Sequence, residues 1–340
     1  MGFDIIKNLV NTKIILKKRP SKTITEDLFQ NINDEIDEIR DNHFLVEVEY
    51  VSIDPGMRGW ISDVGNYSEP VPLNSTMRSF GVGKIIFSKN KNFKVNEYVV
   101  GWLGWQRFSV VDENKIQLKI DPKSAPLSKH LGVLGLNGIT AYAGLIDICK
   151  PKKNDVVLVT TAAGSVGSAV GQLAKIYGCR TIGLTSSDNK VAMCKSKFGY
   201  DEVINYKEES DLSNRIKKIA PNGIDCFFDN VGGTQFDAVI ENLNIKARIV
   251  ICGTIGMPSF PMPIGPRVNR TLLIKRAKIE GLLVLDYFNK YQEIYNNLLK
   301  WYVEGKLVSE EDISDGLESA PASLVKILNG LNLGKQLVKL

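Results

Sequence analysis

The stretch DVVLVTTAAGSVGSAVGQLAKIYGCRTIGLTSSDNK, residues 155–190, decides the fold of this chain. Residues 155–160 form a short run rich in β-branched apolar side chains, which is typical of a strand buried on both faces of a parallel sheet. After a turn at residues 162–167, apolar residues recur at helical spacing until Gly178 ends the helix. Residues 180–184 return to a strand pattern. The stretch therefore predicts the order strand, glycine turn, helix, strand.

The glycine turn predicts a site for the diphosphate of a dinucleotide. A helix that begins directly after a tight turn points its free N–H groups and the positive end of its dipole at the space above the strand, where an anion fits. Gly164 leaves room for the backbone to approach the ligand, and Gly167 lets the helix lie close on the sheet. Ala162 replaces the first glycine of G-x-G-x-x-G, and the motif alone is more often an ordinary turn than a nucleotide site. The strand before it, with the helix and strand after it, favours the dinucleotide.

The end of the second strand indicates which dinucleotide binds. An NAD site carries an Asp or Glu there for the ribose 2′-hydroxyl. This chain instead has Thr185-Ser186-Ser187, and the later Asp188 is interpreted as a helix N-cap. Lys190 offers a positive charge to a 2′-phosphate, although a solvated lysine beside a capping Asp is the alternative. The sequence therefore predicts NADP(H) as the cofactor.

Composition indicates a globular protein of two domains. The chain has 340 residues, of which 44% are hydrophobic and 24% charged. The net charge of +5 is spread along the chain without a basic stripe, so nucleic acid is not an expected partner. Five cysteines stand singly, no secretory leader is recognisable, and no apolar run approaches the roughly 18 residues of a membrane span. We therefore expect a cytoplasmic protein without a membrane partner.

Residues 1–125 are predicted to be β-rich. Short β-type runs alternate with Pro, Gly, Asn and Ser, which is typical of a small barrel or sandwich; the runs are residues 13–16, 44–52, 81–87, 97–105 and 107–111. Between two of them, residues 54–72 form an irregular insert long enough for a binding loop. Arg58 and Tyr67 lie in this insert. The alternative to ligand contact is structural, with Arg58 fixing a turn and Tyr67 half-buried.

Strands and helices alternate in the rest of the chain. Further strands are predicted at residues 203–204, 224–228, 247–252 and 279–285, which gives an α/β fold with a doubly wound parallel sheet. Ligands of such a sheet bind at the carboxyl ends of the strands, where Tyr206 and Asn230 lie. Tyr206 suits the adenosine phosphate and Asn230 the ribose or nicotinamide, while turn roles are the alternative for both. Residues 286–303 are predicted to form a helix whose apolar residues pack against the domain. Residues 334–338 are predicted to form a last strand that returns to the first domain.

Few residues are available for metal or hydrolytic chemistry. A zinc-dependent dehydrogenase needs converging Cys, His and carboxylate ligands. The chain has two histidines, His43 and His130, and no paired cysteines. A Ser-His-acid hydrolase is equally poorly supported. The sequence therefore predicts no metal centre.

Several segments together resemble the zinc-independent branch of the medium-chain dehydrogenase/reductase superfamily. The group that they resemble contains leukotriene B4 12-hydroxydehydrogenase/prostaglandin reductases and alkenal or curcumin double-bond reductases. The segments are VSIDPGMRGWISD (51–63), GLNGITAYAGL (135–145), TTAAGSVGSAVGQLAK (160–175), DCFFDNVGG (225–233), RIVICGTI (248–255) and NLGKQLVKL (332–340). The resemblance covers nearly the whole chain. It implies a GroES-like substrate domain of residues 1–125, completed by residues 305–340, around a Rossmann NADP-binding domain of residues 126–304.

The resemblance also implies the residues of the site. The diphosphate would be held by Gly164, Ser165, Val166 and Gly167, the 2′-phosphate by Lys190 and Tyr206, and the ribose side of the nicotinamide by Asn230. The segments flanking the nicotinamide would be Cys252, Gly253, Thr254 and Ile255 with Leu282, Leu283 and Val284, and Asn332 would reach it from the tail. A homodimer that joins two Rossmann sheets edge to edge is implied as well.

Two positions depart from the pattern of this group. Its members often read D-P-Y-M-R where this chain has Gly56, and often carry a tyrosine shortly after C-G-x-I, where this chain has Pro258. Those tyrosines are candidate substrate-pocket groups. Tyr67 and Tyr287 are the candidate replacements, and both are candidate substrate contacts together with Arg58. The candidate catalytic donor is Tyr67, with the ribose 2′-hydroxyl of the cofactor as the alternative.

The activity implied by the resemblance is NADPH-dependent reduction of the carbon–carbon double bond of α,β-unsaturated aldehydes or ketones, of the 2-alkenal or 15-oxoprostaglandin 13-reductase type. The β-carbon would receive hydride, and the resulting enolate would take a proton at the α-carbon. Two alternatives are a quinone reductase of the same superfamily and a non-catalytic NADPH-binding protein.

Overall fold

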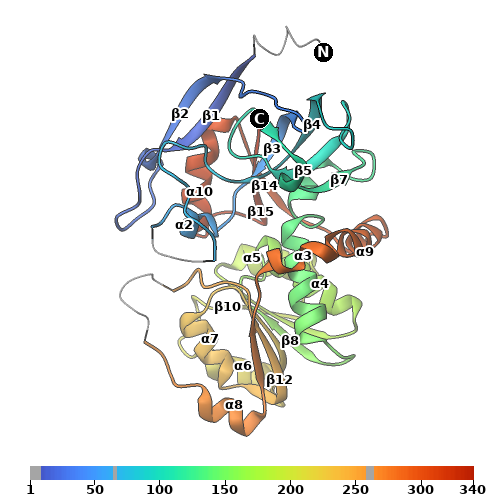
Figure 1. Cartoon of the computed structure of the whole chain (residues 1–340). Coiled ribbons are helices and arrows are strands. Elements are labelled where there is room, and N and C mark those ends of the chain that lie inside the picture. The colour runs from blue at the N-terminus through green and yellow to red at the C-terminus, as the bar shows by residue number, and fades with distance from the viewer. Residues whose placement is uncertain (1–8, 64–66, 258–263) are drawn as a thin grey trace. The chain divides into compact units, whose positions relative to one another are not determined.

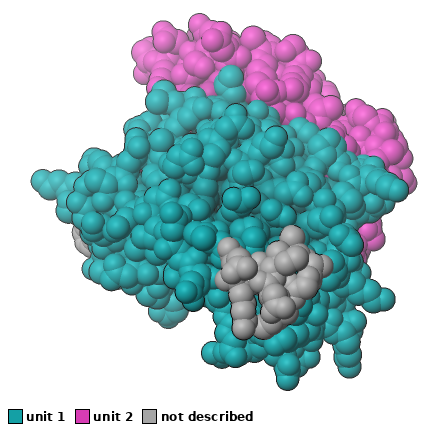
Figure 2. Space-filling model, turned by 90° about the horizontal axis from the view of Figure 1, so that it is seen from above, with its two compact units in different colours: residues 1–131, 311–340 teal, residues 132–310 magenta. Residues whose placement is uncertain are grey.

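A computed structural model describes residues 9–63, 67–257 and 264–340 of the chain. The chain divides into two compact units, one made of residues 1–131 with 311–340 and the other of residues 132–310 (Figure 2). Both chain ends therefore belong to the same unit. Among the described residues, no helix is both long and apolar enough to cross a bilayer.

The second unit is built on a parallel six-stranded sheet in the order β10-β9-β8-β11-β12-β13 (Figure 1). Its strands are β8(Val156–Val159), β9(Arg180–Thr185), β10(Glu202–Asn205), β11(Ile224–Asp229), β12(Leu243–Ile251) and β13(Lys278–Gly281). This is the doubly wound Rossmann order, so the predicted α/β fold is confirmed. The strand order reverses between β8 and β11, and such a switch point is where ligands of this fold bind.

Helices connect these strands and bury the apolar side chains of the sheet. They are α3(Leu136–Tyr142), the π-helix η4(Ala143–Cys149), α4(Ser165–Ile176), α5(Asp188–Ser196), α6(Leu212–Ile219), α7(Gly233–Ile240), α8(Asn269–Lys275), the 3₁₀-helix η5(Val284–Lys290) and α9(Tyr291–Val303). Leu158, Ile182 and Phe227 from three neighbouring strands are completely buried in the core. Burial on both faces explains the unbroken apolar runs of the sequence.

The predicted boundaries after β12 differ from the structure. The strand expected over residues 279–285 ends at Gly281, and the helix expected from residue 286 becomes a regular α-helix only at Tyr291. Buried side chains at helical spacing begin at Tyr291 and continue to Leu298, whereas η5 contributes none. Since tertiary packing supplies most helical stability, the α-helix begins where burial begins.

The first unit contains a seven-stranded sheet in the order β14-β15-β3-β4-β5-β7, with β6 pairing to β3. Its strands are β3(Phe44–Ser52), β4(Phe80–Ser88), β5(Tyr98–Trp102), β6(Phe108–Val111), β7(Ile116–Ile120), β14(Glu311–Asp315) and β15(Lys335–Lys339), and a separate hairpin joins β1(Val10–Leu16) to β2(Phe29–Glu35). Its helices are η1(Glu26–Leu28), α2(Met57–Trp60), η2(Glu113–Lys115), η3(Leu127–Leu131), η6(Leu317–Ser319) and α10(Ala320–Leu328). The predicted β-rich, GroES-like domain is confirmed. The β2 strand was not predicted because most of its side chains are exposed and show no apolar alternation.

The C-terminal strand returns to the first unit, as predicted. β15 pairs antiparallel with β3, with Leu337 opposite Ser52. At the start of β15, the Lys335 ammonium lies 2.5 Å from Asp54 Oδ1 and donates to the Ile53 carbonyl at 3.1 Å. The Lys335 side chain is only 3% exposed. This buried ion pair fixes the last strand to the loop that precedes α2.

Replacing Lys335 by Met is expected to destabilise the protein by about 3 kcal/mol, because the Asp54 carboxylate stays buried without its cation. The free energy of unfolding, measured by denaturant titration, tests this value. The control is Lys119→Met, which breaks the half-exposed pair between Lys119 and Glu97 and is expected to cost at most about 1 kcal/mol. Equal losses in the two variants would contradict the role given to the buried pair.

Candidate dinucleotide site

The turn between β8 and α4 brings the start of the helix close to the end of the strand. Thr161 adopts a left-handed conformation with φ of 55°, and the Gly164 amide donates to its carbonyl at 2.8 Å. A Cβ placed on Gly167 would lie 2.2 Å from the Thr161 carbonyl oxygen, which is far inside contact distance. Only glycine fits at position 167, so the first turn of α4 rests on the turn backbone with its amides at the end of β8.

A glycine on the neighbouring strand makes room for Ala162, the alanine that replaces the first glycine of the motif. Ala162 is fully buried, and a Cβ placed on Gly183 of β9 would lie 2.7 Å from the Ala162 methyl group. Gly183 thus leaves on β9 the space that the alanine needs. The buried Tyr200 adds a further support, because its hydroxyl donates to the Gly167 carbonyl at 2.6 Å. The sequence did not predict a role for Gly183 or Tyr200 because both lie outside the motif.

Asp229 organises the loop at the end of β11. It is 1% exposed, and its Oδ1 accepts hydrogen bonds from the Thr160 hydroxyl at 3.0 Å and from the Val231 amide at 3.0 Å. Burial raises the pKa of this carboxyl, opposed by these hydrogen bonds. Asn230 donates its side-chain Nδ2 to the Thr160 carbonyl at 2.8 Å. This contact turns Asn230 Oδ1 to the opposite side, where it can accept a ligand hydroxyl.

Two lysines follow β9 and β10: Lys190 in the first turn of α5 and Lys207 after β10. Lys190 is half-buried, and burial followed by the positive charge of Lys207 lowers its pKa. Asp188 Oδ1 accepts from Asn205 Nδ2 at 3.0 Å. The N-cap of α5 is Ser187, so the N-cap interpretation of Asp188 was wrong by one residue: this carboxylate instead joins α5 to the end of β10.

Tyr206 follows β10 directly and is half-buried. Its amide donates to the Thr185 carbonyl at 3.0 Å, which fixes it beside the end of β9. Lys190, Tyr206 and Lys207 therefore lie on one edge of the sheet, beyond the carboxyl ends of β9 and β10. We call this edge the rim. An anion near both lysines would offset the repulsion between their charges. The sequence pattern did not single out Lys207 as a site residue.

The predicted nicotinamide segments lie at the ends of β12 and β13. The Cys252 amide donates to the Asp229 carbonyl at 2.8 Å, and a Cβ on Gly253 would lie 2.9 Å from the Asn230 carbonyl oxygen. The segment 252–255 therefore packs against the loop after β11. Leu282 is joined to the end of β12 through its amide, which donates to the Ile251 carbonyl at 2.9 Å. Residues 282–284 are half-buried, as a surface that covers a ring would be.

The predicted substrate contacts fall in both units. Arg58, on α2, and Asn332 are half-buried in the first unit, and Asn332 donates to the Gly334 carbonyl at 2.8 Å. Tyr67 also belongs to the first unit and is 57% exposed, so the half-buried alternative does not describe it. Tyr287 lies on η5 in the second unit, where burial and then the Asp147 carboxylate raise its pKa. Pro258 lies outside the described residues.

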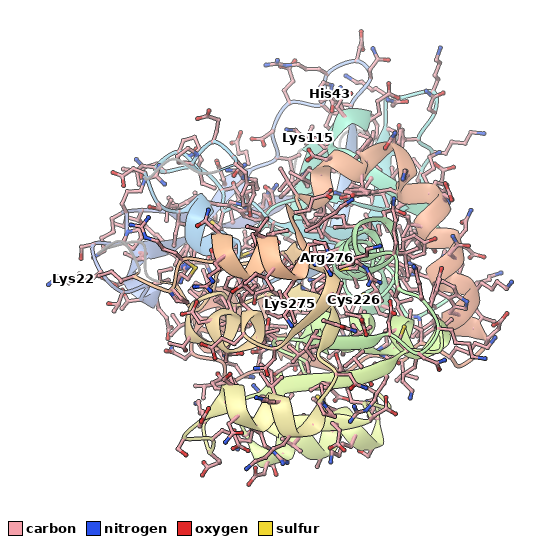
Figure 3. All side chains as sticks on the ribbon, turned by 90° about the horizontal axis from the view of Figure 1, so that it is seen from below. Lys22, His43, Lys115, Cys226, Lys275 and Arg276 are labelled. Carbon is pink, nitrogen blue, oxygen red and sulfur yellow. The ribbon has the colours of Figure 1, made fainter. Side chains whose placement is uncertain are left out.

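Within residues 9–63, 67–257 and 264–340, no three His, Cys, Asp or Glu side chains converge to hold a metal ion. Burial raises the thiol pKa of Cys179 to about 11 and of Cys194 and Cys252 to about 12. A hydrogen bond with Cys149 and burial raise the pKa of Cys226, which lies on β11 among the strands (Figure 3). Burial lowers the pKa of His130 to about 4. These thiols therefore stay protonated near neutral pH, where a thiol is a poor nucleophile.

The predicted dinucleotide residues of the second unit lie in the connections that follow the carboxyl ends of its strands or at the start of the next helix. Gly164 and the first residues of α4 follow β8, Lys190 lies in the first turn of α5 after β9, and Tyr206 and Asn230 directly follow β10 and β11. Residues 252–255 and 282–284 follow β12 and β13. One rim of one sheet thus offers helix amides, a basic pair and an apolar segment, which are the groups that a nicotinamide dinucleotide phosphate requires.

Comparison with known proteins assigns the chain to a family. Residues 12–118 match the model of the N-terminal domain of oxidoreductases, and residues 165–303 match the model described as zinc-binding dehydrogenase. The chain is 41% identical to a 2-alkenal reductase (NADP(+)-dependent) of Nicotiana tabacum over 87% of each chain. It is 37% identical to prostaglandin reductase 1 of Bos taurus over 90% of this chain and 92% of the relative.

A solved structure extends these matches to three dimensions. The structure of CurA from Vibrio vulnificus in complex with NADPH aligns with a TM-score of 0.90 at 37% identity, covering 96% of this chain and 98% of that one. Identity at this level over nearly the whole length of both chains confirms the resemblance found in the sequence. The protein therefore belongs to the medium-chain dehydrogenase/reductase family, in the group that contains the 2-alkenal and prostaglandin reductases.

Proposed function

We propose that this protein is an NADPH-dependent reductase of the carbon–carbon double bond of α,β-unsaturated aldehydes and ketones. The names of its relatives describe 2-alkenal, pulegone, curcumin and prostaglandin reductases, at 33–41% identity. The observation that carries the proposal is the basic rim at the end of β9, where Lys190 and Lys207 lie together and Asp188 is bound to Asn205. That rim suits the 2′-phosphate of NADPH, because its two cations can pair with a dianion and one oxygen of its acid is engaged by Asn205.

The residues of the second unit fit NADPH. The diphosphate would lie at the N-terminus of α4, on Gly164, Ser165, Val166 and Gly167, because Gly167 lets the helix rest on the turn. Lys190 and Tyr206, with Lys207 beside them, would hold the 2′-phosphate, and Asn230 the ribose of the nicotinamide. Residues 252–255 and 282–284 would flank the nicotinamide, and Asn332 would contact it from the first unit.

The chemistry requires a hydride, a donor for the carbonyl oxygen and a proton. When bound, NADPH supplies the hydride for the β-carbon of the enal or enone. Donors that face the carbonyl oxygen stabilise the enolate, and each such donor is worth roughly 3 kcal/mol in comparable oxyanion sites. The α-carbon then takes a proton, and the product keeps its carbonyl group.

Tyr67 is the candidate donor of that proton, and Arg58 and Tyr287 are candidate contacts of the substrate. The environment of Tyr287 opposes a donor role, because burial and Asp147 raise its pKa and make its proton harder to release. Tyr67 is instead exposed, and a positive charge, that of Arg78, interacts with it. Tyr67 therefore suits proton donation better than Tyr287 does.

The reaction needs no zinc under this proposal. The support is that, within residues 9–63, 67–257 and 264–340, no three His, Cys, Asp or Glu side chains come together as zinc ligands. The five free cysteines are buried or half-buried without forming disulfides, which supports a location in the reducing cytoplasm.

We also propose that one domain binds NADPH and the other binds the substrate, and that two chains form a homodimer. Residues 126–304 would bind NADPH and residues 1–125 with 305–340 the substrate; the compact units divide the chain at 131/132 and 310/311, which supports this division. A second copy would join at β13, the last strand of the described sheet. Exposed Leu273 and Ile274 on α8 support a covered surface nearby, ahead of Lys275 and Arg276 at the end of that helix (Figure 3).

A substrate panel tests the activity. With NADPH, we expect reduction of the carbon–carbon bond of a long-chain 2-alkenal or an aryl enone, unchanged by a chelator, and no reduction of a saturated aldehyde. Cofactor oxidation is followed by absorbance and products by mass spectrometry. Activity on a quinone alone would place the protein with the quinone reductases, and NADPH binding without turnover on any substrate would favour the non-catalytic alternative.

The basic rim is tested by Lys190→Ala, Lys207→Ala and the double variant. Each loss of a charge-assisted contact is expected to raise KM for NADPH about tenfold, while KM for NADH stays nearly constant because NADH has no 2′-phosphate. Lys217→Ala, in the last turn of α6, is the matched control. Steady-state kinetics with both cofactors check the prediction, and equal changes for NADPH and NADH would contradict it.

A further inference from the structure

Two side chains of the first unit, Tyr67 and Trp60, lie beside Gly56 at the start of α2, and a third lies beside them. A Cβ placed on Gly56 would lie 3.0 Å from the Tyr67 hydroxyl and 3.7 Å from the nearest carbon of the Trp60 ring. A larger residue at position 56 would press on the Tyr67 hydroxyl, so the glycine keeps the place of this hydroxyl open. The third side chain is Arg78, which the sequence did not single out.

Arg78 is held on two sides. The centre of its guanidinium lies 5.4 Å from the centroid of the Trp60 ring, within the range of a cation–π contact. Its Nη2 also donates to the Glu69 carbonyl. The charge of Arg78 interacts with Tyr67. A half-buried cation therefore stands fixed beside the phenol rather than moving freely in solvent.

Trp60 adds an unused donor to the same place. Trp60 is 5% exposed, and its indole Nε1–H has no acceptor within the described parts of the chain. The ring carbon Cε2, which is bonded to this nitrogen, lies 3.8 Å from the Cβ position of Gly56, the point that is 3.0 Å from the Tyr67 hydroxyl. A buried donor without an acceptor costs free energy. A nearby oxygen that becomes negative would relieve that cost.

We propose that Arg78 is a positioning residue that, with the Trp60 indole, prepares Tyr67 to give its proton to the substrate. A cation and a spare N–H donor both stabilise the phenolate more than the phenol, so they favour the state that follows proton transfer. In that step the O–H bond of Tyr67 breaks, and the electron pair of the enolate forms the new C–H bond at the α-carbon. The phenolate then recovers a proton from water. The inference rests on the proposed function and names two residues beyond it.

The test separates the charge of Arg78 from its structural contacts. Arg78→Gln removes the charge but keeps an N–H donor for the Glu69 carbonyl, and Arg78→Lys keeps the charge. For enone reduction, we expect Arg78→Gln to lower kcat about tenfold or more with KM for the enone nearly unchanged, and Arg78→Lys to stay within about threefold of the wild type. The solvent deuterium isotope effect on kcat should rise in Arg78→Gln, because proton transfer becomes slower.

A double-mutant cycle and a matched control complete the test. Tyr67→Phe should lower kcat at least as much as Arg78→Gln, and the double variant should be no slower than Tyr67→Phe, because Arg78 acts through Tyr67. Arg107→Gln is the control, since this guanidinium also lies 5.4 Å from a ring centroid, that of Phe108, and should leave kcat unchanged.

Additive losses, a change in KM alone, or full activity of Tyr67→Phe would overturn the inference while the proposed function stands. An inactive wild-type protein would instead refute the proposed function. Circular dichroism melting curves identify any variant that has lost its fold, and Tyr67→Phe with Arg78→Lys still decides the question if Arg78→Gln is unstable.

Discussion

The candidate site depends on the close approach of α4 to the turn after β8. Position 167 carries no Cβ, and an ideal Cβ placed there would lie only 2.2 Å from the Thr161 carbonyl oxygen, so the first turn of the helix can rest on this turn only with glycine. Tyr200 holds this arrangement from behind through its hydrogen bond to the Gly167 carbonyl. The free amides of the helix therefore lie at the switch point of the sheet, and the other loops of the rim extend that anion site in both directions.

The loops around this turn show how the fold sets cofactor choice. Asp229, buried at the end of β11, accepts hydrogen bonds from the Thr160 hydroxyl and from the amides of Val231 and Gly232. Its carboxylate is therefore bound to the protein itself rather than directed at a ligand. On the other side, the carboxylate of Asp188 is bound to Asn205, and the positive charges of Lys190 and Lys207 remain at the rim. Discrimination between two cofactors that differ by one phosphate thus rests on where the acids are directed as much as on where the lysines lie.

The sequence predicted the regular part of the structure well because periodicity reports burial. The unbroken apolar runs of β8 and β9 and the glycines of the turn were sufficient to place the sheet, the helix and the rim. β2 was missed because its exposed side chains carry no apolar pattern. The α-helix start at Tyr291 was misplaced because apolar residues continue before burial begins.

The site was less predictable than the fold, since its supporting residues meet only through tertiary structure. Gly183 compensates Ala162 from a neighbouring strand, and Lys207 acquires meaning from its interaction with Lys190. Arg78 reaches Tyr67 and Trp60 from a strand connection with no motif of its own. Such contacts join residues that neither periodicity nor spacing relates, so a single sequence cannot rank them.

The most direct test of the proposed reaction is the fate of the hydride. The enzyme is given NADPH dideuterated at C4 of the nicotinamide and an aryl enone in ordinary water, and the product is analysed by NMR and mass spectrometry. We expect one deuterium at the β-carbon, a solvent proton at the α-carbon and an intact carbonyl group in the product. Deuterium on the carbonyl carbon of an allylic alcohol would contradict it, because the enzyme would then reduce the carbonyl and not the double bond.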